Sequence, residues 1–216
     1  MPLLGTFNLH ASLLPNYRGA APINWAIING ETLTGVSTFF IDEKIDTGAM
    51  ILQESIEIHP KENAGQLHDK LMHLGAKLVI ETVMLIEQGN TITTPQPDTK
   101  HIKTAYKLNK DNCRINWNID SKSIYNLIRG LNPYPAAWSM LYNNNVELNV
   151  KIYDVKFIKE NHQLEIGQIK TTKDSIKVAI ENGFISLLEI KLPGKRKMDI
   201  KSLLNGYDLK SDAKML

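Results

Sequence analysis

The sequence of 216 residues contains one cysteine, Cys113, and no long uninterrupted run of apolar residues. A single cysteine excludes an intramolecular disulfide and a zinc site built on cysteines, and it is typical of proteins of the reducing cytosol. No apolar run approaches the roughly 20 residues that a membrane-spanning helix needs. We therefore expect a cytoplasmic protein without a membrane partner. Its hydrophobic content of 43% is enough to bury the core of one large domain or two small ones.

The chain also has little overall charge. Its formal net charge of +2 by itself argues against a strongly basic nucleic-acid-binding protein. The charge is unevenly distributed, however. Residues 1–99 carry 5 lysines and arginines against 11 aspartates and glutamates, a net of −6, whereas residues 100–216 carry 20 against 12, a net of +8. An acidic half followed by a basic half indicates two modules with different partners.

A proline-rich stretch marks the boundary between the two halves. Residues 93–98 (TTPQPD) hold two prolines in three positions, which favours extended backbone and excludes a helix. The charge balance changes sign just beyond this stretch. We therefore expect a first domain over residues 1–90, a linker over residues 91–107 and a second domain over residues 108–216.

The first domain has the pattern of part of an α/β fold. Runs rich in β-branched and aromatic residues predict strands, and leucines at helical spacing predict a long helix after Asn63. The expected order is a strand over 6–9, a helix over 22–28, strands over 33–41 and 49–58, and a helix over 63–88. This order resembles the second half of an α/β domain.

The second domain has a different pattern, of short alternating segments punctuated by Asn, Gly and Asp. A short helix is expected first, capped by Ser121 or Ser123. Several short strands at regular spacing then predict a small antiparallel barrel or sandwich. The expected elements are the helix over 121–129 and strands over 147–155, 166–171, 175–180 and 184–191.

Three polar residues of the first domain form its densest candidate site. Asn8 and His10 alternate on one strand and therefore face the same side, near the strand end where α/β sheets bind ligands. With Asp46, they offer an amide for an oxyanion, an imidazole for proton transfer and a carboxylate to fix the imidazole. None is a strong nucleophile, which favours direct transfer of an acyl group to an amine over a covalent intermediate. Each residue taken alone is more often an ordinary turn residue.

A metal site is not expected. His10 has no second histidine nearby in the sequence. His68 and His73 are five residues apart, which departs from the i, i+4 spacing that metal-binding helices favour.

Longer strings resemble one family. Residues 8–23 (NLHASLLPNYRGAAPI) and 45–51 (IDTGAMI) are similar to the signature of folate-dependent formyltransferases, in which Asn-x-His and Ser-Leu-Leu-Pro precede a distant Asp-x-Gly. The spacing from His10 to Asp46 fits this signature. Residues 128–138 (IRGLNPYPAAW) and 192–198 (LPGKRKM) resemble motifs of the family's C-terminal domain. The fuller string HASLLPNYRGAAPINWAI is most similar to the branch that formylates methionyl-tRNA.

The resemblance implies a fold and a reaction. The fold would be the second half of a Rossmann-like formyltransferase domain, followed by a small OB-like antiparallel β-barrel that binds tRNA. The reaction would transfer a formyl group from 10-formyltetrahydrofolate, without a metal, to the α-amine of initiator methionyl-tRNA in translation initiation. The complete protein would be a monomer.

The resemblance also assigns roles to residues. Asn8 and protonated His10 would stabilise the oxyanion of the tetrahedral intermediate, and Asp46 would hold His10 charged and relay the amine proton. The residues expected to contact the folate are Ser12, Leu13, Leu14 and Pro15.

Basic residues supply candidates for binding tRNA, because contacts from Lys and Arg to phosphates provide much of nucleic-acid affinity. The candidates are Arg18, Lys191, Lys195, Arg196 and Lys197. The alternative for the four in the second half is a solvated loop. We interpret Tyr134 and Trp138 as packing aromatics rather than base-stacking platforms.

One departure from the family bears on activity. The Asn-x-His motif begins at residue 8 here, whereas in the family it lies well inside the first domain. We therefore expect an N-terminally truncated chain with an unpaired strand edge and poor activity on its own. Two other functions remain open. One is a folate-dependent formyltransferase or hydrolase that acts on another substrate, against which the basic half argues, and the other is a non-catalytic RNA-binding remnant.

Overall fold

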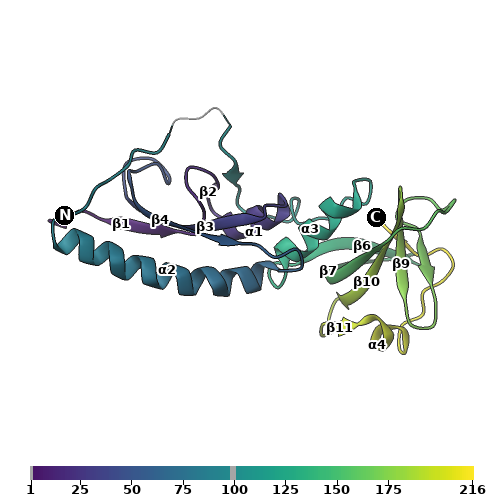
Figure 1. The fold of residues 1–216 in the computed structure, drawn as a ribbon. Coiled ribbons are helices and arrows are strands. Elements are labelled where there is room, and N and C mark those ends of the chain that lie inside the picture. Colours follow the sequence, from purple (N-terminus) through teal and green to yellow (C-terminus); the bar gives the residue numbers. More distant parts are fainter. Residues whose placement is uncertain (1, 98–100) are drawn as a thin grey trace. The chain divides into compact units, whose positions relative to one another are not determined.

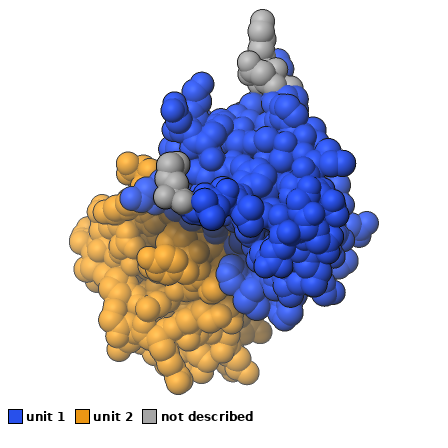
Figure 2. Space-filling model, turned by 90° about the vertical axis from the view of Figure 1, so that its left-hand side faces the viewer, with its two compact units in different colours: residues 1–108 blue, residues 109–216 orange. Residues whose placement is uncertain are grey.

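The computed structural model describes residues 2–97 and 101–216. It divides into two compact units, residues 1–108 and residues 109–216, which Figure 2 distinguishes by colour. Among the described residues, no helix is both long and apolar enough to span a membrane.

The first unit is built on a three-stranded sheet. Strands β1 (Phe7–His10), β3 (Leu33–Phe40) and β4 (Met50–Glu57) pair in the order β1-β3-β4, and both pairs are antiparallel. Helix α2 (Ala64–Glu87) runs along this sheet (Figure 1) and contacts β3 and β4. Helix α1 (Pro22–Ile28) contacts α2. The strands and helices predicted for this half are confirmed to within one residue at each end.

Helix α2 is defined by its cap and by one apolar face. The Asn63 side chain accepts a hydrogen bond from the backbone N–H of Gln66, whose side chain in turn accepts from the N–H of Asn63. This reciprocal pair satisfies two backbone donors that a helix start otherwise leaves unpaired. Leu67, Leu71 and Leu78 then fall on one face and are buried in the core of the unit. The leucine spacing that predicts the helix is therefore also the spacing that packs it.

Two short strands have no counterpart in the sequence prediction. β2 (Arg18–Gly19) and β5 (Thr104–Ala105) form a parallel pair, and Thr94 pairs with Met50 at the start of β4. β5 and Thr94 both belong to the segment expected to be a linker. The described part of that segment therefore makes hydrogen bonds within the first unit, and residues 98–100 of it lie outside the described residues.

The second unit is a nearly closed antiparallel barrel with a helix packed on it. Its sheet has the order β12-β6-β7-β10-β9-β8, and a bridge between Gln168 and Lys214 links the two ends of this order. Helix α3 (Ser121–Leu131) packs against β7. The strands and the remaining helix are β6 (Ala137–Asn143), β7 (Val146–Ile158), β8 (Ile169–Thr171), β9 (Ile176–Ile180), β10 (Gly183–Lys191), β11 (Met198–Asp199), α4 (Ile200–Leu204) and β12 (Lys214–Met215).

The predicted antiparallel barrel is thus confirmed, with two corrections of detail. The cap of α3 is Asp120, whose carboxylate accepts from the backbone N–H of Ser123, and not a serine as expected. A carboxylate at this position also faces the positive end of the helix dipole. In addition, β6, β11, α4 and β12 were not predicted.

Candidate active site

The loop that follows β1 is fastened to β3. Ser37 on β3 donates its hydroxyl to the carbonyl of Ser12 at 2.7 Å and accepts from the N–H of Leu14 at 3.2 Å. The Ser12 hydroxyl closes the loop by donating to the carbonyl of Asn16 at 2.7 Å. Ser12 and Leu14 are buried, whereas Leu13 and Pro15 are partly exposed. Of the four residues expected to contact folate, Ser12 and Leu14 thus hold the loop in place, while Leu13 and Pro15 have side chains that are accessible to a ligand.

His10 ends β1 and is held by one ring nitrogen. Its Nε2 lies 2.8 Å from the carbonyl oxygen of Tyr17. A carbonyl oxygen only accepts, so we assign the hydrogen of the neutral ring to Nε2. The other nitrogen, Nδ1, lies 3.7 Å from Oδ2 of Asp46. This distance fits an ion pair but is longer than a hydrogen bond, so Nδ1 faces the carboxylate without donating to it directly.

Tyr17, which supplies that carbonyl, is itself firmly placed. Its backbone has φ of +61°, its side chain is buried, and its hydroxyl donates to Glu31 at 2.5 Å. Burial, together with this bond to the Glu31 carboxylate, raises the pKa of Tyr17 well above its usual value. Tyr17 therefore stays neutral near neutral pH and keeps the O–H that donates to Glu31.

Asp46 reaches His10 from the loop between β3 and β4, residues 41–49. Its backbone is left-handed, with φ of +55°, a conformation that Asp tolerates better than most residues. Its Oδ2 accepts a hydrogen bond from the N–H of Gly19 at 2.9 Å. A Cβ at Gly19 would lie 2.4 Å from the Ala105 carbonyl oxygen, so only glycine fits there. The β2–β5 pair thereby fixes the donor that holds the carboxylate.

Asn8 is exposed and makes no hydrogen bond to another described side chain. Its orientation follows from its neighbour, because Leu9 lies against Gly75 of α2. Alternation along β1 then directs Asn8 and His10 to the face of the sheet opposite α2. The structure thus brings His10 and Asp46 together and leaves Asn8 on the same side, available to a ligand.

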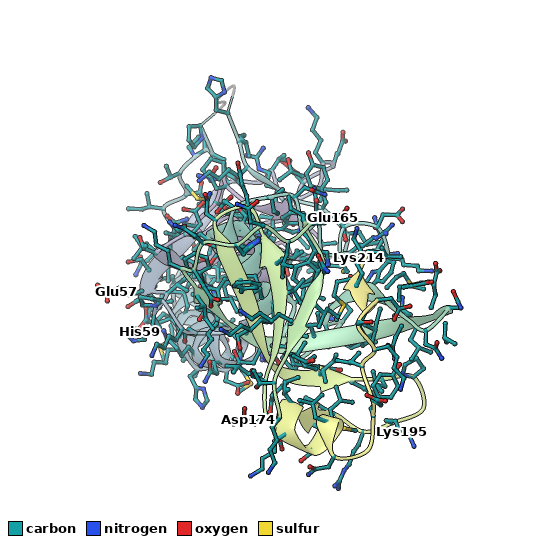
Figure 3. The ribbon with its side chains drawn as sticks, turned by 90° about the vertical axis from the view of Figure 1, so that its right-hand side faces the viewer. Glu57, His59, Glu165, Asp174, Lys195 and Lys214 are labelled. Carbon is teal, nitrogen blue, oxygen red and sulfur yellow. The ribbon has the colours of Figure 1, made fainter. Side chains whose placement is uncertain are left out.

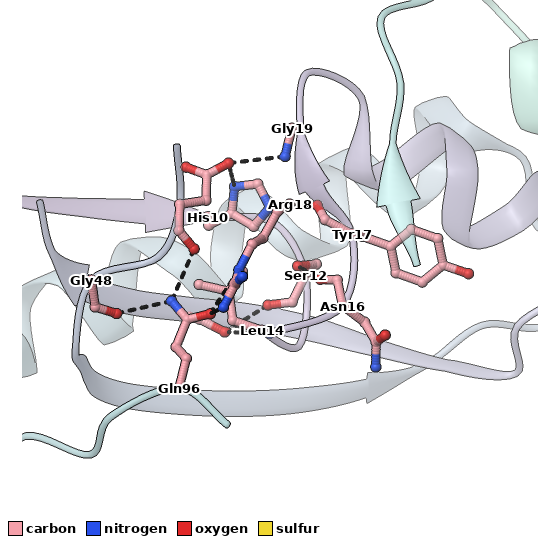
Figure 4. A network of polar contacts seen from close by, with 11 residues as sticks. His10, Ser12, Leu14, Asn16, Tyr17, Arg18, Gly19, Gly48 and Gln96 are labelled. Carbon is pink, nitrogen blue, oxygen red and sulfur yellow. Dashed lines mark hydrogen bonds and ion pairs between the residues drawn. The ribbon is translucent and has the colours of Figure 1, made fainter. Parts of the chain in front are cut away.

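One residue of this network was missed by the sequence analysis. The Oε1 atom of Gln96 accepts from Nε and Nη2 of Arg18 at 3.0 and 2.6 Å, and its Nε2 donates to the carbonyls of Asp46 and Gly48 at 2.9 and 2.8 Å (Figure 4). The only sequence signal for it is a polar residue between two prolines. A pocket of about 500 Å³ lies beside this network, lined by Arg18, Asp42, Glu43, Lys44, Thr47, Gln96 and Pro97.

The basic candidates of the second unit lie at and after the end of β10. Lys195, which is labelled in Figure 3, and Arg196 are exposed in the loop before β11. Lys197 is paired with Glu189 at 2.7 Å, and its ammonium lies 5.3 Å from the ring centre of Tyr153. Lys191 is partly buried. Lys195 and Arg196 are therefore the members of the cluster most open to a partner.

The two aromatic residues behave differently from each other. Tyr134 has a relative exposure of 81%, so its interpretation as a packing residue is wrong. The prolines on either side of it hold the chain in a turn that leaves the ring in solvent. Trp138 is partly buried, and its indole N–H donates to the carbonyl of Lys110 at 2.7 Å. The cations of Lys110 and Arg114 lie 5.4 and 5.5 Å from its ring centre.

Among the described residues, no group of three or more His, Cys, Asp or Glu side chains is arranged to hold a metal ion.

Two sequence families match the chain. Residues 1–83 match the family described as "Formyl transferase", and residues 107–208 match "Formyl transferase, C-terminal domain". The chain, an α/β unit followed by a barrel, is therefore a formyltransferase.

Relatives narrow this class. The chain is 63% identical over its whole length to the methionyl-tRNA formyltransferase of Flavobacterium johnsoniae, of which it covers 68%. It is 60% identical over 95% of its length to that of Flavobacterium psychrophilum, of which it covers 65%. The chain belongs to the methionyl-tRNA formyltransferase family, and it spans about two thirds of the length of these relatives.

A solved structure supports the fold. The N-formyltransferase of Helicobacter canadensis, in complex with folinic acid and dTDP-3-aminofucose, superposes with a TM-score of 0.64 at 23% identity, over 89% of this chain and 66% of that one. The expected fold class, a partial Rossmann-like domain followed by a small antiparallel barrel, is confirmed. The family resemblance and the enzyme class inferred from the motifs are confirmed as well.

Proposed function

We propose that the protein carrying this chain transfers a formyl group from 10-formyltetrahydrofolate to the α-amine of initiator methionyl-tRNA. The observation that supports this most directly is the position of His10. Its Nε2 is tied to the Tyr17 carbonyl, and its Nδ1 faces the Asp46 carboxylate at 3.7 Å. An imidazole held in this way has one nitrogen free for a proton, next to a negative charge that suits an imidazolium.

The chemistry needs no covalent enzyme intermediate. The amine nitrogen attacks the formyl carbon, and a new C–N bond forms while the formyl oxygen becomes an oxyanion. Collapse of this tetrahedral intermediate breaks the bond between the formyl carbon and N10 of the folate. The proton lost by the amine is gained by N10. A site for this reaction must stabilise the oxyanion and move one proton.

The residues at the end of β1 match those two needs. The exposed amide of Asn8 offers a hydrogen-bond donor to the oxyanion, and a His10 imidazolium on the same face of the sheet would add a positive charge near it. Asp46 supplies the countercharge for the imidazolium and an acceptor for the amine proton. Leu13 and Pro15 offer partly exposed apolar surface to the folate, while Ser12 and Leu14 hold the loop.

A tRNA acceptor agrees with the charge of the second half. Residues 100–216 carry a net charge of +8, and Lys195 and Arg196 are exposed there. Phosphate contacts from such residues give salt-dependent affinity for nucleic acid. In the first unit, Arg18 lines the pocket beside Asp46 and is the nearest candidate for a phosphate of the tRNA end.

The test compares acceptors. Because the chain spans about two thirds of its relatives, we would assay both the chain and a hybrid in which it replaces the matching residues of the F. johnsoniae relative. Each is given 10-formyltetrahydrofolate with either initiator methionyl-tRNA or dTDP-3-aminofucose. We expect the hybrid to formylate the methionyl-tRNA and not the sugar. Formylation of the sugar instead, or binding of tRNA at low salt without any turnover, would refute the proposal.

A further inference from the structure

Gln96 connects the segment after α2 to the loop that carries Asp46. Both N–H groups of its side-chain amide are used on that loop, one on the carbonyl of Asp46 at 2.9 Å and one on the carbonyl of Gly48 at 2.8 Å. We propose that Gln96 is a positioning residue for Asp46, which holds the carboxylate in place against His10. This inference deepens the proposed function and rests on the role given there to Asp46.

Asp46 needs such support because its own backbone does not favour the observed conformation. Asp tolerates a left-handed φ of +55° better than most residues, but the conformation still costs more than a right-handed one. Asp42, Glu43, Lys44 and Ile45, the residues before Asp46 in the loop, are exposed and provide little packing. The two bonds from Gln96 bracket the Asp46–Gly48 turn. They therefore oppose the rotation that would swing the carboxylate away from His10.

Gln96 is in turn well anchored. Two residues earlier, Thr94 exchanges backbone hydrogen bonds with Met50, at 2.8 and 2.9 Å. The Oε1 atom of Gln96 accepts hydrogen bonds from both Nε and Nη2 of Arg18, and this pair of bonds fixes the plane of the Gln96 amide (Figure 4). Gln96 is also partly buried, whereas the described residues around it, 92–95 and 97, are exposed. An otherwise solvent-facing segment thus directs one side chain into the site.

The amide performs two separable tasks, since it accepts from Arg18 and donates to the loop. Gln96→Glu keeps the acceptor for Arg18 and places a carboxylate oxygen where the two donors were, so it removes the bonds to Asp46 and Gly48 and adds one negative charge. Gln96→Met has a similar length and neither donates nor brings a charge, and it serves as a second variant if Gln96→Glu does not fold. Gln163→Glu makes the same chemical change at an exposed position of the second unit and is the matched control.

The decisive readout is the ring-nitrogen NMR signals of His10 in the 216-residue chain, recorded at one pH. Asp46→Asn defines the signals of His10 without its carboxylate. We expect Gln96→Glu and Gln96→Met to move the Nδ1 and Nε2 signals toward those of Asp46→Asn, and Gln163→Glu to leave them at the wild-type positions. A purely structural role would lower the unfolding temperature without this shift. The inference is wrong if Asp46→Asn moves the signals and neither Gln96 variant does, or if Asp46→Asn itself leaves them unchanged.

Kinetics of the hybrid add a second readout. We expect Gln96→Met to lower kcat for formyl transfer by about 10- to 100-fold, with KM for the tRNA and the folate nearly unchanged, because a carboxylate displaced by about an ångström still permits binding. A rise in KM at constant kcat would overturn the positioning role. Shifted His10 signals with an unchanged kcat would instead contradict the catalytic role of Asp46, so the two proposals can fail separately.

Discussion

The carboxylate of Asp46 lies 3.7 Å from Nδ1 of His10, although the two residues are 36 positions apart and come from different elements. Three separate features produce this meeting. β1 ends at His10, the Tyr17 carbonyl takes the other ring nitrogen, and Gly19 donates to the same carboxylate oxygen that faces the ring. Backbone groups of Tyr17 and Gly19 therefore help to place both side chains. A substitution that changes the local backbone conformation should alter the distance between His10 and Asp46.

Gly19→Ala tests this directly. A Cβ there would lie 2.4 Å from the carbonyl oxygen of Ala105, and the φ of +119° is strained for any other residue. We expect a loss of roughly 1–3 kcal/mol in the free energy of unfolding, together with a fall in kcat of the hybrid. Gly206→Ala is the control, because a Cβ at Gly206 meets nothing within 4 Å and should change stability by no more than about 0.5 kcal/mol. Equal effects of the two substitutions would contradict the account.

Thr82→Val tests a buried chain of hydroxyls between α2 and the sheet. The Thr82 hydroxyl donates its hydrogen to the Leu78 carbonyl at 2.7 Å. It must therefore accept in its 2.8 Å contact with the Thr38 hydroxyl. The Thr38 hydroxyl in turn accepts from the N–H of Leu52. Valine has the same shape but leaves the Thr38 hydroxyl without an acceptor in the core. We expect a destabilisation of about 1–3 kcal/mol in denaturant unfolding. Thr93→Val, at an exposed position, should be neutral, and a neutral Thr82→Val would show that the hydroxyl chain contributes nothing.

The cap of α3 gives a pH-dependent prediction. Hydrogen bonds from Ser123 hold the pKa of Asp120 below its usual value in the folded state. Its stabilising effect is therefore present above the unfolded pKa of about 3.9 and is lost as the pH falls through the lower folded value. Asp120→Ala should destabilise the second unit by about 1 kcal/mol at pH 7 and by progressively less below pH ~4.

Asp120→Asn provides the comparison for that experiment. Asparagine also caps helices but does not titrate, so the difference in stability between Asp120→Asn and Asp120→Ala should not depend on pH over the same range. Thermal unfolding of the three proteins between neutral and acid pH measures both effects. A destabilisation by Asp120→Ala that stays constant down to the acid limit would rule out the titrating cap.

Cys113 should be unreactive in the folded protein. Its side chain is buried, with a relative exposure of 3%, and burial raises the pKa of the Cys113 thiol. Since the thiolate is the reacting form, alkylation at neutral pH should be slowed by at least about tenfold relative to the unfolded chain. Mass spectrometry after timed treatment with iodoacetamide, with and without denaturant, measures this ratio. Equal rates in the two conditions would show that the start of the second unit is open.

An element can be predicted from the sequence when neighbouring residues determine it, and not when residues far along the chain do. The long helix α2 carries its own cap at Asn63 and its own leucine face, and the strands of the first sheet carry dense β-branched and aromatic runs, so local pattern was sufficient. The pairing of β2 with β5 was not predictable, because two-residue strands have no period and their partners are 86 positions apart. β6 was not predicted, because its burial does not follow its polarity: Ser139 and Asn143 are buried, whereas the apolar Trp138, Met140 and Tyr142 are half-buried.

The residues of the candidate site likewise differ in how far they could be predicted from the sequence. His10 and Asp46 could be named from residue chemistry and from the family signature, but the Tyr17 carbonyl and the Gly19 N–H are backbone groups that any residue type supplies. Gln96 acts through contacts 48 to 78 positions away along the chain, and the proline-rich segment around it reads as a plain connection. Such contributions depend on the folded backbone and leave little trace in local composition.

The catalytic role proposed for His10 is tested by the rate of formyl transfer to initiator methionyl-tRNA by the hybrid with His10→Ala. Under the proposed function, removing the His10 imidazole should lower kcat by about 10²- to 10⁴-fold. His59→Ala, which removes an exposed histidine of the same unit (Figure 3), is the matched control and should leave kcat at the level of the unsubstituted hybrid. We predict a large loss for His10→Ala alone, and equal rates for the two variants would show that His10 has no catalytic role.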